Sequence, residues 1–494
     1  MYGAEMLCGS FGASHAINLF VVGMSLRLLF VSPIDLSVID DVVWIWYYDR
    51  QGVVQSEGIN FLDDWPSFLV LLYALQRLEL EQWGLNPRLD YRVRIAHHGG
   101  TFPRDYSRKI VQPTEWEVNV GPIMIELLTE RRLYSALGIT GRGTVAVEAR
   151  SNLPGRTRKL AVKLYWPEQV RPKETEIIAE ARALGRRDPA ITNHLPVVIA
   201  EEDFPYFTGN VRNALGVSDG RPGYSRSRVM RVIVFTLLEP ITKLRKSHFV
   251  RAWLECLRCK CYHTDGYAHF LNHQQILLGH FKLWELGFEH GDPSLANLMI
   301  DPATNRGVLN DWDLSFRRSR DRVGHVGGER TGTVPFMAMD LLCRKYWDGE
   351  MERLYRHDLE GLIWILPWVF LQFQGTTLEV PQLASWSTGD YLRCAEKKAH
   401  FYVHHTDYIP MNSWKSEWAL VSVVIGWRQR LAFTLQEGGL GQRPQGKRRR
   451  PEKDQDEASR VAQDVFNDFC RVLWEHRGRY RPLAKLMRDL GLNP

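Results

Sequence analysis

The sequence HGDPSLAN at residues 290–297, followed by DWD at residues 311–313, decides the interpretation of this chain. Asp292 stands five residues before Asn297, and Asp311 follows after two short apolar runs. Those runs, LMI and VL, predict a strand pair that brings the three oxygen-bearing side chains to one point. Asparagine and aspartate supply the hard oxygen ligands that Mg²⁺ prefers.

This spacing suits the transfer of a nucleotide γ-phosphate to a hydroxyl group. Asp292 would orient the attacking hydroxyl, while Asn297 and Asp311 would bind Mg²⁺. Both residue types also favour turns, which is the simpler explanation for Asn297 and Asp311. Their spacing from Asp292 argues against that explanation. His290 is predicted to be a buried hydrogen-bonding residue and not an acid or base.

A glycine-rich segment lies upstream, where GITGRGTV at residues 138–145 predicts a turn between two strands. Gly138, Gly141 and Gly143 would let backbone N–H groups approach phosphates closely, because glycine has no Cβ. Val145, at the end of the turn, is also expected to contact the nucleotide. The spacing differs from the common G-x-G-x-x-G, so this segment alone is a weak indication.

The order of these motifs resembles that of the protein kinase-like superfamily. The matching segments are LAVKL at 160–164, HGDPSLAN at 290–297, DWD at 311–313, GTVPFMAMDLL at 332–342 and RHDLEGLIWIL at 356–366. The resemblance implies an α+β, two-lobed fold, with a small β-rich N-lobe and a larger helical C-lobe. It also implies that Lys163 binds the phosphates of ATP and that Asp358 stabilises the catalytic loop at residues 290–297.

The resemblance implies two further contacts to the nucleotide. A carboxylate on the helix after the lysine strand should pair with Lys163. Glu176 is preferred, and Glu174 and Glu180 remain alternatives because the sequence does not settle the helical register. Glu239, in the Leu-Glu-Pro segment after an apolar strand at residues 229–238, would lie at the hinge that contacts adenine.

Further segments are similar to those of the fungal-type protein kinase family. They are VWIWYYDRQGVVQS at 43–56, an apolar helix at 68–78, WGLNP at 83–87, KLYWPE at 163–168, TVPFMA at 333–338 and HDLE at 357–360. The similarity runs from about Asp40 to the C-terminus. It implies an intracellular enzyme, cytoplasmic or nuclear, that uses ATP and Mg²⁺ to phosphorylate serine or threonine of a protein substrate.

Three departures from the common kinase pattern keep other functions open. Gly291 replaces an arginine that reads activation-segment phosphates, and Ser294 replaces a phosphate-contacting lysine. Asp313 replaces a glycine, which predicts a stiffer metal-binding loop. Because His-Gly-Asp also occurs in aminoglycoside and choline kinases, a small-molecule kinase is the second hypothesis. A pseudokinase that serves as an interaction scaffold is the third.

The expected organisation has four parts. Residues 1–40 form an uncertain tail, 41–120 an N-terminal extension, 121–240 the N-lobe and 241–494 the C-lobe. Within the C-lobe we expect an insertion at 259–277 and a basic disordered loop at 437–460. Cys256, Cys259, Cys261 and His263, near the start of the insertion, could bind zinc. The insertion hypothesis is preferred.

Net charge, cysteine content and the apolar runs indicate which kinds of binding partner and which cellular compartment the protein has. The net charge is +6, and residues 442–454 contribute four of those charges through six basic and two acidic side chains. That segment is predicted to be a solvated loop, with nuclear import or nucleic-acid contact as alternatives. The rest of the chain is not built to bind nucleic acid. Seven cysteines indicate a reducing compartment, and the interrupted apolar run at 16–31 predicts a buried strand or helix, not a membrane span.

Overall fold

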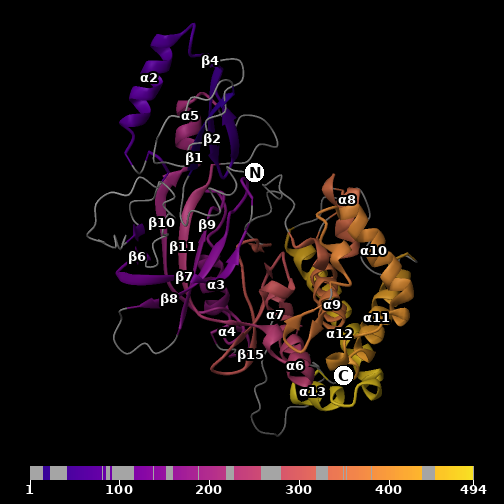
Figure 1. Ribbon diagram of the computed structural model, residues 1–494. Helices are drawn as coiled ribbons and strands as arrows, with labels where there is room; N and C mark the ends of the chain where they lie inside the picture. The colour runs from indigo at the N-terminus through magenta and orange to yellow at the C-terminus, as the bar shows by residue number, and fades with distance from the viewer. Residues whose placement is uncertain are drawn as a thin grey trace. The chain divides into compact units, whose positions relative to one another are not determined.

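The computed structural model describes residues 15–22, 42–79, 82–84, 89–91, 116–136, 138–151, 159–186, 189–217, 227–257, 280–318, 332–348, 350–351, 353–379, 381–436 and 451–492. The chain forms two compact units. The first contains residues 1–171 and 197–237, and the second contains residues 172–196 and 238–494. Sheet dominates the first unit and helix the second (Figure 1).

The first unit is built on a seven-stranded antiparallel sheet of order β10-β11-β9-β8-β7-β6-β5. Its strands are β5 (Leu89–Tyr91), β6 (Trp116–Val120), β7 (Ile123–Ser135), β8 (Val145–Ser151), β9 (Leu160–Tyr165), β10 (Val198–Phe207) and β11 (Val229–Thr236). Strand β11 is the continuous apolar run that the sequence predicted, and seven of its eight residues are buried. In β8, buried and less buried residues alternate, because successive side chains of a strand point to opposite faces.

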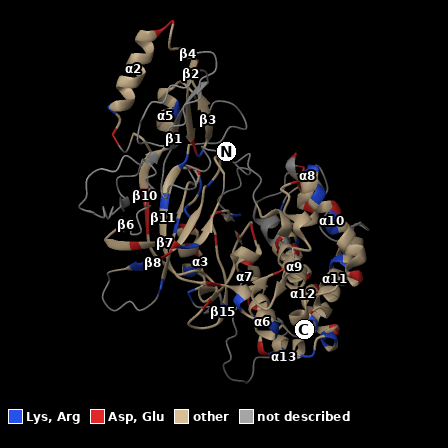
Figure 2. Cartoon of the chain, in the orientation of Figure 1, with Lys and Arg blue, Asp and Glu red and all other residues tan. Residues whose placement is uncertain are grey.

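A smaller sheet in the first unit comes from the N-terminal extension. It contains β1 (His15–Val22), β2 (Val42–Asp49), β3 (Gly52–Gln55) and β4 (Ile59–Asn60). Helix α2 (Trp65–Gln76) packs Phe68 against this sheet and has no charged side chain within its bounds (Figure 2). Its N-cap Asp64 accepts a hydrogen bond from the Ser67 N–H at 3.3 Å. Helix α5 (Thr208–Ala214) follows β10.

The second unit is mainly helical. Its helices are α3 (Glu174–Leu184), α4 (Pro189–Thr192), α6 (Lys246–Leu257), α7 (His280–Glu285), α8 (Arg344–Trp347), α9 (Tyr355–Gln372), α10 (Tyr391–His404), α11 (Ala419–Gln436), α12 (Pro451–Glu475) and α13 (Leu483–Asp489). Helix α9 is buried along almost its whole length and packs against α11 and α12. From Gly361 to Leu371 its sequence is apolar on all sides, as expected for a helix at the centre of a unit.

Short strands and 3₁₀ turns connect these helices. The strands are β12 (Glu239–Pro240), β13 (Phe288–Glu289), β14 (Leu298–Asp301), β15 (Arg306–Leu309), β16 (Phe316–Arg317), β17 (Phe373–Gln374) and β18 (Thr377–Leu378). The 3₁₀ turns are Ile241–Lys243, Leu295–Asn297, Val334–Phe336, Met339–Leu342, Ala384–Trp386, His405–Asp407, Asn412–Trp414 and Arg477–Arg479. Strands β12, β14 and β15 pair in one three-stranded sheet.

Two boundaries differ from the sequence prediction. Helix α12 begins at Pro451, so residues 451–460 are helical and the expected basic loop ends earlier. Proline suits the first turn of a helix, and from Ala462 onward apolar residues of α12 recur at helical spacing and are buried. Residues 172–196, expected in the N-lobe, group with the helical unit.

Other expectations fall on residues outside the described ranges. These are the tail apart from β1, the insertion at 259–277 with its cysteines and histidines, and the basic run before Pro451. Cys256, the one possible zinc ligand that is described, is buried in α6. None of the described helices is long and apolar enough to cross a membrane.

Candidate active site

The β14–β15 hairpin brings together the residues that the opening motif predicted. Leu298 pairs with Leu309 across the hairpin, and the Asn310 N–H donates to the carbonyl of Asn297 at 2.8 Å. Asn297 and Asp311 therefore lie at the same end of the strand pair. The strand pair that the sequence predicted is confirmed.

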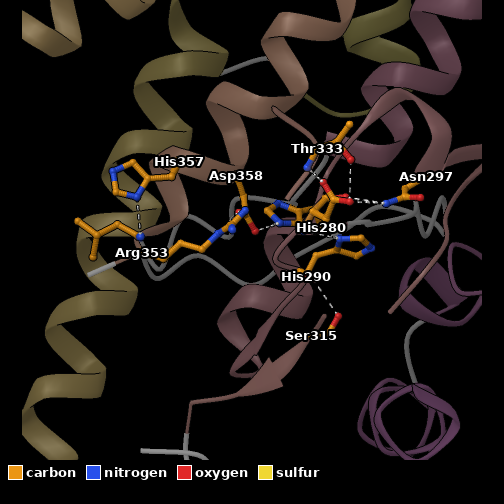
Figure 3. A network of polar contacts seen from close by, with 10 residues as sticks. His280, His290, Asn297, Ser315, Thr333, Arg353, His357 and Asp358 are labelled. Carbon is orange, nitrogen blue, oxygen red and sulfur yellow. Dashed lines mark hydrogen bonds and ion pairs between the residues drawn. The ribbon is translucent and has the colours of Figure 1, made fainter. Parts of the chain in front are cut away.

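Asp292 lies in the loop between β13 and β14 and is only 8% exposed. One carboxylate oxygen accepts from the Thr333 N–H at 2.8 Å, and the other accepts from the Thr333 hydroxyl at 2.9 Å (Figure 3). The Asn297 amide nitrogen donates to the Asp292 carbonyl at 2.8 Å and lies 3.4 Å from its carboxylate. The carboxylate orientation is thus fixed by partners from two segments.

The donor atoms fit a magnesium ion. Hydrogen bonding to Asp292 fixes the nitrogen end of the Asn297 amide, which leaves the amide oxygen as the atom that could bind a cation. Asp311 supplies a carboxylate and has a φ of +64°, in the left-handed region that non-glycine residues rarely adopt. Within the described residues, no group of three or more histidine, cysteine or acidic residues has the geometry to hold a metal by itself. Two protein oxygens are nevertheless enough for Mg²⁺, which keeps several waters and binds substrate phosphates.

Helix α3 holds the loop that carries Asp311. Glu174 is 1% exposed, and its carboxylate accepts a hydrogen bond from the Trp312 N–H at 2.9 Å. The Trp312 ring is fully buried and packs edge-on against His290, with ring centroids 4.7 Å apart. Glu176, the preferred partner of Lys163, is exposed, and Glu180 forms an ion pair with Arg317. Its burial and its hydrogen bond thus make Glu174, and not Glu176 or Glu180, the carboxylate of α3 that contacts the loop carrying Asp311.

Gly291 is explained by its surroundings. Its φ is +84°, and a Cβ at this position would lie 2.9 Å from the Leu314 carbonyl oxygen. An arginine would therefore be strained in its backbone and would collide with the loop after Asp311. The Ser315 hydroxyl donates to the His290 carbonyl at 3.1 Å and ties the same two loops together. Ser294 is 1% exposed, so its hydroxyl is enclosed within the loop.

His290 is a fully buried hydrogen-bonding residue. Its Nε2 lies 2.9 Å from the Asn310 carbonyl, and its Nδ1 accepts from the Asp292 N–H at 3.3 Å. A carbonyl can only accept, so these partners require the neutral ring with its proton on Nε2. Burial, together with nearby His280 and Arg353, lowers the pKa of His290 from 6.5 to about 4.

A second buried network lies near His290, which belongs to the catalytic loop (residues 290–297) (Figure 3). Asp358, at the start of α9, is inaccessible to solvent and accepts from His280 at 3.0 Å and from Arg353 at 2.6 and 2.8 Å. Burial alone would raise the pKa of Asp358, but Arg353 and then His280 outweigh it and hold that pKa well below its usual range. The sequence motifs gave no indication of Arg353 or His280.

In the first unit, Lys163 lies in the middle of β9, opposite Ala146 of β8 and Ile233 of β11. It is 8% exposed, and its Nζ lies 4.5 Å from the centre of the Tyr165 ring. Lys163 and the three candidate glutamates belong to different compact units. The pairing of Lys163 with a glutamate stays a prediction.

The glycine turn joins β7 to β8. Gly141 and Gly143 have φ values of +94° and +51°, which glycine adopts readily, whereas Gly138 has an ordinary φ. Val145, the first residue of β8, is packed in the core of the large sheet. Glu239, the predicted hinge residue, is about one-third exposed in the second unit and pairs with Lys243 at 2.9 Å. Its contact with a nucleotide stays a prediction.

The second unit carries the carboxylate and amide residues of a kinase-like phosphotransferase, and the first unit carries a glycine turn and a strand lysine of the kind such enzymes have. The chain matches the family described as fungal protein kinase over residues 29–255 and 272–370, more than half of its length. It therefore belongs to the fungal protein kinase family, which confirms the resemblance found in the sequence. The gap between the two matched segments, residues 256–271, overlaps the expected insertion.

Among solved structures, the chain is similar to the Cydia pomonella granulovirus kinase PK-1. The identity is 11%, the match covers 56% of this chain and 79% of that chain, and the TM-score is 0.33. The chain matches no curated protein.

Proposed function

We propose that this protein transfers the γ-phosphate of ATP to a serine or threonine hydroxyl of a protein, with Mg²⁺ as cofactor. The observation that carries the proposal is the placement of Asn297 and Asp311 at one end of the β14–β15 hairpin, beside the buried carboxylate of Asp292. Membership of the fungal protein kinase family supports a protein as the acceptor.

Each residue has a distinct role in this reaction. Asp292 accepts the hydrogen bond of the attacking hydroxyl and orients its oxygen toward the phosphorus. Its carboxylate already accepts a hydroxyl hydrogen bond, from Thr333 at 2.9 Å, so its geometry suits this role. Asn297 and Asp311 would hold Mg²⁺, which neutralises charge on the phosphates when bound. Lys163 and the glycine turn would hold the nucleotide phosphates.

The test is transfer of labelled phosphate from ATP to a mixed protein acceptor, with autophosphorylation followed in parallel. Asp292→Asn and Asp311→Asn should each abolish transfer, because asparagine is neither a proton acceptor nor an anionic ligand. Asp301→Asn is the matched control, since Asp301 lies at the far end of the same hairpin, where its side chain accepts from the Ala303 N–H at 2.9 Å.

The outcomes separate the three hypotheses. Transfer that requires Asp292 and Asp311 but not Asp301 supports the proposal. Transfer to metabolites such as choline or aminoglycosides, with none to protein, would replace it with a small-molecule kinase. Nucleotide binding without transfer to any acceptor, or no nucleotide binding, would replace it with an interaction scaffold.

A further inference from the structure

The turn between β2 and β3, in the N-terminal extension, is held rigidly in place. Asp49 is inaccessible to solvent, and its carboxylate accepts from the Gln51 and Gly52 N–H groups at 2.8 and 3.0 Å. The same carboxylate accepts two hydrogen bonds from the Arg212 guanidinium of α5, at 2.9 and 2.7 Å. Two-point pairing of this kind fixes orientation as well as distance.

The next residue of this turn, Arg50, contacts the glycine turn at three points. Its carbonyl accepts from the Gly141 N–H at 3.0 Å, and its guanidinium donates to the Gly138 carbonyl at 2.8 Å. A Cβ on Gly143 would overlap the guanidinium, so the third glycine leaves room for it. Arg50 is only 2% exposed.

These contacts determine which hydrogen-bond donors of the glycine turn can bind a phosphate. The Gly141 N–H already donates to Arg50 and is therefore not aimed at an anion. Glycine-rich segments lose more conformational freedom on ordering than other segments. Without Arg50, the free-energy cost of ordering this turn would reduce the affinity for a nucleotide. Arg50 orders the turn in advance and places a positive charge beside it.

We propose that Arg50 is a positioning residue, which holds residues 138–143 in the conformation that receives nucleotide phosphates. The N-terminal extension is then a working part of the nucleotide-binding unit and not an appended module. This inference rests on the proposed function, because it takes the glycine turn to be the phosphate-binding segment. The phosphates, and not the nucleoside, are the part of the ligand that depends on Arg50.

The test compares the binding of ADP and of adenosine by calorimetry, because only ADP carries phosphates. Arg50→Gln should weaken ADP binding about tenfold, the effect of losing one or two hydrogen bonds that preorganise the site. Adenosine affinity should stay within about twofold of wild type. Arg131→Gln is the matched control, since Arg131 is an exposed arginine of β7, the strand that leads into the glycine turn, and pairs with Glu148 at 3.2 Å.

A second variant approaches the same contact from the other side. Gly143→Ala should also weaken ADP binding selectively, because its Cβ displaces the guanidinium and because alanine is strained at a φ of +51°. The first part of the loss should disappear in the Arg50→Ala background, so Gly143→Ala should weaken ADP binding less there than in wild type. If Arg50→Gln does not fold, Gly143→Ala decides the question by the same comparison.

Two results would overturn the inference while the proposed function stands. One is unchanged ADP affinity in both variants, and the other is an equal loss of ADP and adenosine affinity. Wild-type protein that binds no ADP at all would overturn the proposed function, and the inference with it.

Discussion

Asp292 and Thr333 are joined by two hydrogen bonds, one to each oxygen of the carboxylate, although 41 residues separate them in the sequence. The backbone N–H of Thr333 donates to one oxygen and its hydroxyl donates to the other. This pairing fixes the segment that begins at residue 332 against the catalytic loop. Thr333 thus orders the carboxylate that the proposed reaction needs.

Thr333→Val should lower phosphate transfer at least about tenfold while ATP affinity stays the same. Valine has nearly the same shape but removes the hydroxyl donor to a charged acceptor, a bond worth roughly 1.5–3 kcal/mol. The backbone bond remains, so the protein should stay folded. Thr333→Ser keeps the hydroxyl and should retain most activity. Equal turnover by the valine and serine variants would contradict this role.

Glu174 and Glu176 provide a matched pair on one helix. Glu174→Ala would leave the buried N–H of Trp312 without its acceptor, which costs about 1–3 kcal/mol. We expect a lower unfolding free energy and a large loss of turnover, because the loop that carries Asp311 loses its support. Glu176→Ala changes an exposed side chain and should differ little from wild type. Urea unfolding and initial-rate measurements on both variants check this, and a larger effect at Glu176 would contradict it.

Arg353 and Asp358 form a buried ion pair near His290. Arg353→Met should destabilise the protein by roughly 3–5 kcal/mol, because it leaves the Asp358 charge buried without its guanidinium partner, and His280 is a single hydrogen-bonding neighbour. The control is Arg471→Met, which removes an exposed pair with Glu475 and should cost less than about 1 kcal/mol. Chemical denaturation of both variants is the measurement. Similar losses would show that burial of the pair is unimportant.

His290 predicts how stability depends on acid. Its pKa is about 4 in the folded protein, below the ordinary 6.5, so between these values the unfolded chain binds more protons. The unfolding free energy should therefore fall as the pH falls from 6.5 toward 4. A proton on Nδ1 would also break the hydrogen bond from the Asp292 N–H, so transfer by the folded protein should decline only as the pH approaches 4.

The variant that isolates this effect is His290→Gln. Glutamine can donate to the Asn310 carbonyl and accept from the Asp292 N–H, but it does not titrate. The difference in unfolding free energy between wild type and variant should change across pH 4 to 6.5 and be constant above it. Parallel pH curves would mean that His290 titrates normally in the folded state.

Local spacing made the centre of the candidate site predictable. The apolar runs around residues 298–309 could form only a short hairpin, and the structure has the expected pairing. Glu174 could not be chosen over Glu176, because tertiary packing decides which face of α3 is buried. Thr333 and Arg353 were missed as partners, because their contacts join segments far apart in the chain. Arg50 was missed because nothing in its own segment marks a contact with the glycine turn.

Lys398 is a lysine with no solvent exposure in helix α10. Its Nζ donates to the Met337 carbonyl at 2.5 Å and lies 4.9 and 5.5 Å from the ring centres of Trp364 and Trp386. The ring faces favour the ammonium form. Burial opposes it more strongly and lowers the pKa of Lys398 from 10.5 to about 8.

The lowered pKa of Lys398 predicts that the unfolding free energy also depends on pH in the alkaline range. Between pH 8 and 10.5 the unfolded chain keeps the lysine proton that the folded chain has lost, so the unfolding free energy rises with pH in this range. Lys398→Met removes the titration and keeps an apolar stem against the tryptophans. The stability of wild type relative to this variant should therefore increase between pH 8 and 10.5 in urea unfolding. A difference that stays constant with pH would mean that the tryptophan rings compensate fully for burial of the charge.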